Sequence, residues 1–407
     1  MMKIIFLTLY DIGSYAERNL YCDLLREFVR EGHEVFCVSP SERRTGLPTR
    51  LLEDGHLLKV RIGNIQKTGM LEKGISTLLL EGTYKRAVKK YFSGIKFDLI
   101  LYSTPPITLS GVVEYIRKRD NAATYLLLKD IFPQNAVDIG VMKKSGVTGI
   151  LYRYFRRKEK HLYEISDRIG CMSPANVEYI KKHNPEVLPA KLEVCPNSME
   201  IEDKIMAPET RKSVREKYGL PLDRKIFVYG GNLGKPQGIP FLIECLEAAK
   251  RDDRVFFLIV GNGTEYGRLE EYVRASGTGS VKLLRSLPRG EYDELIAACD
   301  VGMIFLDYRF TIPNFPSRLL GYMQARLPVL AVTDPNTDIG SVIVDGRFGW
   351  GLPANDARGF ADKLEKIVSA DLPRIGEDGF AYLVRHYRSS LSCAIIADSV
   401  SGGPRGY

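Results

Sequence analysis

The sequence predicts an α/β protein with two doubly wound, Rossmann-like parallel sheets, and three observations lead to this fold class. Short apolar runs alternate with amphipathic helical stretches along the chain. The alternation begins again after a polar stretch at Met199–Arg211, and the length of 407 residues suits two or three domains. A composition of 44% hydrophobic and 27% charged residues is typical of globular proteins, which excludes disordered, collagen-like and disulfide-dense chains.

The expected elements follow in order along each half of the chain. In the first half we expect strands at Ile4–Tyr10, His33–Ser39, Leu99–Ser103, Ala123–Leu128, Ile169–Ser173 and Leu192–Cys195, with helices at Ala16–Glu31 and near Thr77–Phe92. In the second half we expect strands at Lys225–Tyr229, Val255–Val260, Val281–Leu284, Val301–Phe305 and Val329–Val332, with helices near Pro240–Lys250, Tyr266–Ala275, Tyr292–Ala298 and Ser317–Ala325. The polar stretch is then a linker, and ligands are expected at the carboxyl ends of the strands.

Charge and cysteine content limit the environment and the partners of the chain. The balance of 58 Lys and Arg against 50 Asp and Glu gives a net charge of +8, which suits nucleotide phosphates or an anionic lipid surface but not a dedicated nucleic-acid binder. Seven scattered cysteines without a C-x-x-C pair favour a reducing cytoplasm. The apolar N-terminus is expected to be a first strand rather than a signal peptide, and no run of 18 apolar residues predicts a membrane span.

The strongest local motif runs from Phe227 to Gly238 as Phe-Val-Tyr-Gly-Gly-Asn-Leu-Gly-Lys-Pro-Gln-Gly. Four glycines in nine residues, between a strand and a helix, leave backbone amides open to an anion, and Lys235 adds a positive charge. An ordinary glycine-rich turn is the alternative interpretation. The motif is not a Walker A loop, because Gly-Lys-Ser/Thr is missing.

Two weaker motifs follow strands in the same half. Ile259-Val-Gly-Asn-Gly263 is a glycine turn that can border a nucleotide, although a plain tight turn is the simpler interpretation. In the segment Ile312–Met323, Pro316 suits the first turn of a helix, and Ser317 and Arg318 follow at its anion-favouring end. An ordinary helix start is the alternative there.

Taken together, these motifs resemble those of family 4 glycosyltransferases of the GT-B fold, above all bacterial enzymes that build O-antigen or capsule. The resemblance rests on Gly-Asn-Leu-Gly-Lys-Pro-Gln-Gly, Ile-Val-Gly-Asn-Gly, Pro-Ser-Arg-Leu-Leu-Gly-Tyr-Met and Leu-Pro-Val-Leu-Ala, and in the first half on Lys129-Asp-Ile-Phe-Pro133, Ser173 and Val194-Cys-Pro-Asn-Ser198. It implies an acceptor domain at 1–200 and a donor domain at 201–380 facing across a cleft. It also implies a helical segment at 381–407 that returns to the first domain, with Tyr382–Arg388 at its start.

The resemblance implies transfer of a sugar from a nucleotide-diphosphate donor, with a UDP-sugar favoured, and with retention at the anomeric carbon. The enzyme would be a hexosyl- or N-acetylhexosaminyltransferase. The implied diphosphate-binding residues are Gly13, Gly231, Asn232, Lys235, Gln237, Ser317 and Arg318. The base and ribose would contact Gly261, Asn262, Ser286, Leu287 and Gly321. The donor sugar would contact Asn314, Phe315 and Pro316. No cofactor is expected.

One departure from the family concerns its Glu-x7-Glu motif. The two carboxylates fall near Pro313 and at Gly321, so the family's ribose-binding glutamate is missing. The departure implies weaker donor affinity, an altered donor mode or a partner protein that does not catalyse.

Catalysis in such retaining enzymes needs no protein nucleophile, because the leaving phosphate helps to deprotonate the acceptor. Asp130 at a strand end is the candidate for orienting or deprotonating the acceptor hydroxyl, and a structural turn-capping role is the alternative. No Asp-x-Asp occurs, so a metal-independent reaction with no metal site is expected.

Two basic stretches in the first half suit a membrane surface. Amphipathic helices are expected around Leu78–Phe92 and Leu151–Ile165, and the cations in question are Lys85, Arg86, Lys89, Lys90, Arg153, Arg156 and Arg157. Packing of one helix face on the sheet, with the cations in water, is the alternative. The expected location is the cytoplasm, with peripheral binding to the inner face of the plasma membrane.

The expected partners are a nucleotide sugar, a lipid-linked or oligosaccharide acceptor, an anionic membrane surface and no nucleic acid. The leading hypothesis is a glycosyltransferase of cell-surface polysaccharide biosynthesis. A non-catalytic GT-B partner subunit is the alternative that Gly321 favours. A nucleotide-sugar epimerase shares the fold but fits the helix and loop motifs less well.

Overall fold

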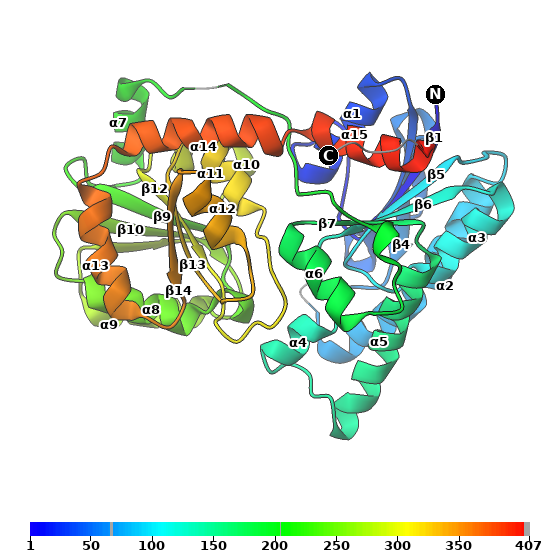
Figure 1. Cartoon of the computed structure of the whole chain (residues 1–407), viewed down its shortest axis with the longest axis horizontal. Coiled ribbons are helices and arrows are strands. Elements are labelled where there is room, and N and C mark those ends of the chain that lie inside the picture. Colours follow the sequence, from blue (N-terminus) through cyan, green and yellow to red (C-terminus); the bar gives the residue numbers. More distant parts are fainter. Residues whose placement is uncertain (66–67, 204, 403–407) are drawn as a thin grey trace. The chain divides into compact units, whose positions relative to one another are not determined.

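The computed structural model describes residues 1–65, 68–203 and 205–402 and divides into two compact units. Unit 1 comprises Met1–Glu200 and Arg388–Tyr407, and unit 2 comprises Ile201–Tyr387. Each unit is built around a parallel sheet with helices, as Figure 1 shows, so the predicted α/β fold class is confirmed. Residue 204 of the expected linker and residues 403–407 of the expected C-terminal segment lie outside the described residues.

Unit 1 carries a sheet of eight strands in the order β3-β4-β2-β1-β5-β6-β7-β8 within the described part of the chain. All neighbours are parallel except β3 and β4. The strands are β1 (Lys3–Leu7), β2 (Glu34–Glu42), β3 (Arg50–Leu52), β4 (Leu57–Ile62), β5 (Leu99–Ser103), β6 (Ala123–Leu128), β7 (Arg168–Cys171) and β8 (Leu192–Val194). The helices are α1 (Leu20–Arg30), α2 (Met70–Tyr91), α3 (Ser110–Asp120), α4 (Gln134–Asp138), α5 (Gly146–Ile165), α6 (Pro174–His183) and α15 (Ser389–Ser401).

Unit 2 carries a sheet of six parallel strands in the order β11-β10-β9-β12-β13-β14, again among the residues described. The strands are β9 (Lys225–Asn232), β10 (Val255–Asn262), β11 (Val281–Leu284), β12 (Val301–Phe305), β13 (Val329–Thr333) and β14 (Gly349–Pro353). The helices are α7 (Pro208–Lys217), α8 (Ile239–Ala249), α9 (Tyr266–Ser276), α10 (Arg289–Ala297), α11 (Arg318–Gln324), α12 (Ile339–Asp345), α13 (Ala357–Val368) and α14 (Leu372–His386).

The two sheets bury apolar side chains on both faces, as doubly wound sheets require. In unit 2, alternate residues of β9 and β10 such as Phe227, Tyr229 and Phe257 form a core cluster with α8, α9 and α13. In unit 1, α1 and α15 pack together and join the cluster that contains Ile4 and Phe6 of β1. The seven cysteines are all buried and unpaired.

Several predicted boundaries are wrong for local physical reasons. The first helix begins at Leu20 rather than Ala16, because the Asn19 side chain caps it by accepting the backbone N–H groups of Tyr21 and Cys22. The expected linker contains the start of α7, which has Pro208 in its first turn. Strands β3 and β4 and helix α3 were not predicted, since β3 has only three residues and a polar, glycine-rich stretch precedes β4.

The end of unit 2 also differs from the prediction. Helix α14 begins at Leu372 and continues to His386, so Tyr382 lies inside it rather than at the start of a final segment. The chain leaves unit 2 at Tyr387 instead of residue 381. It enters unit 1 where the backbone N–H of Ser389 donates to the carbonyl of Met199 at 2.9 Å.

Both sheets have a point at which the strand order reverses. In unit 2 this point lies between β9 and β12, and in unit 1 it lies between β1 and β5. Connections leave such neighbouring strands in opposite directions, which opens a crevice outside their carboxyl ends. The glycine-rich segment after Tyr229 and the segment containing Gly13 are therefore the first places to look for a site. None of the helices among the described residues is long and apolar enough to cross a membrane.

Candidate active site

The glycine-rich segment of unit 2 begins inside β9, which continues to Asn232 rather than ending at Tyr229 as predicted. Gly230 lies between two tyrosines. Its N–H donates to the hydroxyl of Tyr322 at 3.0 Å, and a Cβ on Gly230 would come within 1.7 Å of the hydroxyl oxygen of Tyr292. Only glycine fits this position, so the backbone is fixed where the crevice opens.

Gly231 lies against the side chain of Arg318. It has a φ of +127°, and a Cβ there would lie 3.4 Å from the guanidinium carbon of Arg318. The guanidinium also lies over the ring of Tyr229, 4.4 Å from the ring centroid, in a cation–π arrangement. Its Nη1 atom is buried and has no hydrogen-bond partner. A buried guanidinium nitrogen with an unused donor next to exposed glycine backbone is well suited to an anion.

The predicted phosphate-binding side chains of this segment are used in different ways. The amide of Asn232 donates to Oε1 of Gln237 at 3.1 Å, and the same oxygen accepts the backbone N–H of Gly234 at 3.2 Å. These contacts hold the shape of the loop between β9 and α8. Lys235 is exposed at the start of the short 3-10 helix Lys235–Gln237, so its charge is accessible to solvent.

The predicted base-binding residues lie on the neighbouring strand. Gly261 pairs with Gly231 across β10 and β9, and a Cβ on Gly261 would come within 1.8 Å of the carbonyl oxygen of Gly231. The carbonyl of Asn262 accepts the N–H of Leu233 at 2.9 Å. The structure thus brings the two glycine motifs together, because β9 and β10 are paired as far as Asn262. Beyond β11, Ser286 is exposed and Leu287 is partly buried.

The segment before α11 is mostly packed. The side chain of Phe315 is buried in the core, with its ring centroid 6.2 Å from that of Tyr387, so only its backbone is left for the predicted contact with the donor sugar. Asn314 has a buried side-chain nitrogen without a hydrogen-bond partner. Pro316 is partly buried and Ser317 is exposed just before α11. This segment therefore offers the Asn314 amide, the Ser317 hydroxyl and Arg318 as polar groups.

Gly321 lies inside α11, where the family motif would have its ribose-binding glutamate. A Cβ at this position would meet no atom within 4 Å. Crowding therefore does not explain why the glutamate is missing, since a larger side chain has room at this position.

In unit 1, the segment after β1 carries Gly13. Its N–H donates to Oε1 of Glu17 at 2.8 Å, so this donor already has a partner in the chain. The buried Lys59 of β4 holds the same segment, since its ammonium donates to the carbonyl of Ile12 at 2.8 Å and to the hydroxyl of Ser39 at 3.0 Å. No sequence signal distinguishes Lys59 from other lysines in strands.

Asp130, the predicted catalytic residue, follows β6 and is partly buried. Burial raises the pKa of its carboxyl from 3.8 to about 6, although the N–H of Ile131 and the amide of Asn135 favour the charged form. The Asn135 amide nitrogen lies 2.8 Å from both carboxylate oxygens. The N–H of Asp130 itself donates to the hydroxyl of Thr104 at 3.1 Å. A rigidly held carboxyl with a pKa near neutrality is suited to act as a general base.

The cations predicted to form a membrane surface do not share one environment. Arg86, Lys89, Lys90, Arg153 and Arg157 are exposed, and Lys85 is partly exposed. Lys85 and Lys89 lie over the ring of Tyr115, at 5.6 and 4.8 Å from its centroid. Arg156 is an exception, because it points inward and forms an ion pair with the buried Glu159 at 2.6 Å. Its assignment to a membrane surface is therefore wrong.

Comparison with known proteins finds a family model that matches part of unit 2 and relatives that align with much of the chain. Residues 210–375 match the sequence model of the family described as Glycosyl transferases group 1. The chain is 25% identical over 342 residues to the Pseudomonas aeruginosa protein named "Probable glycosyltransferase WbjE", covering 82% of this chain and 81% of that protein. It is 26% identical over 210 residues to the Escherichia coli (strain K12) protein named "Putative colanic acid biosynthesis glycosyl transferase WcaI", covering 51% of this chain and 49% of that protein.

Among solved structures, Anabaena Alr3699/HepE in complex with UDP-glucose superposes with a TM-score of 0.70 and 16% sequence identity. The match covers 99% of this chain and 100% of that chain, and it bears on the fold alone. Membership of family 4 within this fold stays a prediction. Residues 210–375 thus match the model of the Glycosyl transferases group 1 family, and the chain has the GT-B fold and is similar to proteins named for bacterial polysaccharide biosynthesis.

Proposed function

We propose that this protein transfers a hexosyl or N-acetylhexosaminyl residue from a nucleotide-diphosphate sugar to a lipid-linked saccharide during cell-surface polysaccharide biosynthesis. The observation that carries the proposal is the arrangement of Arg318 beside Gly231 and over Tyr229, at the carboxyl end of β9. It lies within the domain that matches glycosyl transferases. Charged donors next to open backbone are what a departing diphosphate requires.

The donor would contact unit 2 at the end of β9. Arg318 would bind the diphosphate with its unpartnered Nη1, and the exposed Lys235 would add a second positive charge. A UDP-sugar is the favoured donor, which is supported by the UDP-glucose complex of the structural relative.

The reaction would proceed with retention and without a metal. The bond between the anomeric carbon and the diphosphate oxygen breaks, and the nucleoside diphosphate leaves with the electron pair. The acceptor oxygen bonds to the anomeric carbon on the same face. Its proton passes to the leaving phosphate or to Asp130, whose pKa of about 6 leaves the carboxylate available at neutral pH.

A lipid-linked acceptor would bring the protein to the inner membrane surface. Exposed apolar residues accompany the exposed cations on the two basic helices, namely Ile75, Leu78 and Leu79 on α2 and Ile150 and Leu151 on α5. Apolar side chains together with cations on a helix surface suit binding to an anionic leaflet.

Donor turnover tests the proposal. The full chain is incubated with UDP-glucose, UDP-galactose or UDP-N-acetylglucosamine and a lipid-diphosphate-linked saccharide, and release of UDP is measured with and without EDTA. We expect release with one donor, dependent on the acceptor and unchanged by EDTA. Absence of UDP binding by calorimetry would contradict the donor assignment.

A non-catalytic partner subunit is the second candidate, and Gly321 favours it because the family's ribose-binding carboxylate is missing there. Such a subunit would bind and stabilise a working transferase. It would release no UDP with any of these donors, alone or with acceptor.

A further inference from the structure

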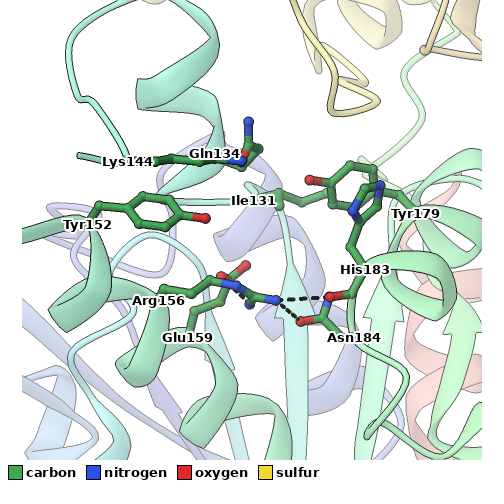
Figure 2. Close-up of a pocket in the computed structure, with 9 residues that line it drawn as sticks. All are labelled: Ile131, Gln134, Lys144, Tyr152, Arg156, Glu159, Tyr179, His183 and Asn184. Carbon is green, nitrogen blue, oxygen red and sulfur yellow. Dashed lines mark hydrogen bonds and ion pairs between the residues drawn. The ribbon is translucent and has the colours of Figure 1, made fainter. Parts of the chain in front are cut away.

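Unit 1 contains a cavity of about 230 Å³ that no sequence motif indicated. Figure 2 shows the side chains that line it, which are Ile131, Gln134, Lys144, Tyr152, Arg156, Glu159, Tyr179, His183 and Asn184. The volume is below the roughly 300–1,000 Å³ of sites for drug-sized ligands, so it suits about one monosaccharide unit. All of these residues belong to unit 1, whereas the residues of the candidate donor site belong to unit 2.

Helical spacing places the polar residues on facing surfaces. Tyr152, Arg156 and Glu159 follow one another at intervals of four and three residues along α5, so they share one face of that helix. Tyr179 and His183 are four residues apart on α6, and their rings stack with centroids 4.2 Å apart. The two helices therefore supply opposite walls.

The floor of the cavity is fixed by Arg156. Its Nη1 pairs with Glu159 at 2.6 Å, and its Nη2 donates to the carbonyl of His183 at 3.1 Å and to Oδ1 of Asn184 at 2.5 Å. Glu159 also accepts the hydroxyl of the buried Tyr163 at 2.8 Å. Arg156 thus holds α5 against the carboxyl end of α6, where a cation is favoured, and the cavity keeps its shape without a ligand.

The walls offer hydrogen-bonding groups to a ligand. The phenol groups of Tyr152 and Tyr179 point into the cavity from opposite sides (Figure 2). No hydrogen bond joins either phenol oxygen to another residue in the described part of the chain. Tyrosine rings with unused hydroxyls suit the mixed apolar and polar faces of a sugar.

The charge of the cavity favours an anion. Arg156 and Glu159 neutralise each other, and the exposed ammonium of Lys144 remains, 5.7 Å from the ring centroid of Tyr152. Burial, together with the charges of Lys182, Lys144 and Arg156, lowers the pKa of His183, which keeps its imidazole neutral at pH 7. The charges of the lining residues therefore sum to one positive charge, that of Lys144.

We infer that this cavity binds a monosaccharide unit that bears an oxyanion, either a carboxylate or a phosphate. We assign this sugar to the acceptor, and that assignment rests on the proposed function. The assignment is supported by the position of the cavity next to the candidate base, since Ile131 lines the cavity and directly follows Asp130. The Asn135 amide, which holds the Asp130 carboxylate, comes from the same helix α4 as Gln134.

Binding of small sugars to the full chain tests the inference. D-glucuronate, D-glucose 6-phosphate and D-glucose are titrated while tyrosine and backbone signals are followed by NMR. We expect at least one of the two anionic sugars to bind about ten-fold or more tightly than glucose. A preference for glucuronate would identify the oxyanion as a carboxylate, and a preference for glucose 6-phosphate would identify it as a phosphate.

Variants distinguish binding inside the cavity from attraction to the general surface charge of the protein. Lys144→Gln is expected to remove the preference for the anionic sugar, and Tyr179→Phe to weaken all sugars about five-fold. Lys143→Gln is the matched control, because Lys143 is exposed and does not line the cavity. An anionic preference that Lys144→Gln leaves unchanged, or equal binding of glucose, would overturn the inference.

The same samples are titrated with UDP, which concerns unit 2 alone. UDP binding without binding of any anionic sugar would overturn this inference and leave the proposed function standing. Binding of the anionic sugar without UDP would support the cavity and contradict the proposed donor.

Discussion

The candidate donor site in unit 2 and the cavity in unit 1 are formed by different parts of the chain, backbone in the first and side chains in the second. In unit 2 the site consists largely of backbone, with Gly230 and Gly261 packed so closely that a Cβ would clash, Gly231 at a positive φ, and one arginine beside them. In unit 1 the cavity consists of side chains from the three helices α4, α5 and α6 and from the segments next to them. Backbone sites require glycine at fixed places and so leave a pattern in the sequence, whereas side-chain sites draw on residues that are common everywhere.

The difference suggests that the two sites bind different parts of the substrates. The backbone site is suited to a diphosphate, which is common to all nucleotide sugars, and the side-chain cavity is suited to the part of a substrate that varies between enzymes. The match of residues 210–375 to a family model is in keeping with this, since the matched part lies in unit 2. The variants below test whether binding in unit 2 and chemistry in unit 1 are separable.

The largest effect is expected from Asp130→Asn, which removes the candidate base of unit 1. We expect the rate of transfer to fall by about 10²–10⁴-fold, the usual contribution of general acid–base catalysis, with UDP affinity unchanged. The fold raises the pKa of Asp130 to about 6, and the charged form is the one that accepts a proton. The wild-type rate should therefore rise between about pH 5 and pH 7, and the residual rate of the variant should lose this rise.

The same pKa has a consequence for stability. Since the folded-state pKa lies above the ordinary value of 3.8, burial favours the neutral acid. The protein loses stability as the pH rises from about 4 to about 6, and Asp130→Asn should reduce that loss. Thermal unfolding across this range checks the sign, and an equal pH dependence in both proteins would contradict the assigned pKa.

Arg318→Gln is expected to have the next largest effect, on binding in unit 2. It removes the proposed charge-assisted hydrogen bond to the diphosphate, worth about 1.5–3 kcal/mol, so UDP should bind about 10–100-fold more weakly by calorimetry. Arg289→Gln is the control, because Arg289 is exposed on α10 and pairs with Asp293. Equal UDP affinities in the two variants would contradict a contact between the diphosphate and Arg318.

The sequence predicted the parts of the molecule that depend on local pattern. The strands Leu99–Ser103, Ala123–Leu128, Val281–Leu284 and Val301–Phe305 were predicted with the observed bounds, because each is a short, largely apolar run. The two glycine motifs were also found, although their contact depends on the pairing of β9 with β10.

The rest depends on contacts between distant residues. Arg156 looked like one of several cations on a basic helix, and only the position of Glu159 and of the end of α6 turns it inward. The Phe315 ring is buried against Tyr387, which lies 72 positions later and which no local pattern connects to it. The raised pKa of Asp130 likewise results from burial in the fold, for which no local pattern exists.

A smaller effect is expected at the surface of unit 1. Replacing Arg153 and Arg157 with Gln removes two exposed cations from α5, each worth on the order of 1 kcal/mol at an anionic leaflet. Sedimentation with phosphatidylglycerol vesicles should weaken by about ten-fold or more. The control replaces Arg251 and Arg268, two exposed arginines of unit 2, and equal losses in both variants would show that only net charge matters.

The smallest effect is expected at Gly321, and it bears most directly on the comparison. A Cβ there meets no atom within 4 Å, and glycine inside a helix costs about 1 kcal/mol relative to alanine, so Gly321→Ala should raise the stability of the protein by about that amount. Gly261→Ala should do the opposite, because its Cβ would lie 1.8 Å from the carbonyl oxygen of Gly231. Thermal unfolding measures both changes.

The variant Gly321→Glu tests whether the site in unit 2 lacks only the ribose-binding carboxylate or binds its donor in a different way. The resemblance to family 4 implies that a carboxylate here would hold the ribose hydroxyls, so UDP should bind more tightly to Gly321→Glu than to Gly321→Ala. Because both variants carry a side chain at the same open position, only the carboxylate distinguishes them. Equal UDP affinities would mean that the ribose lies elsewhere, and that the site of unit 2 binds its donor differently from the family.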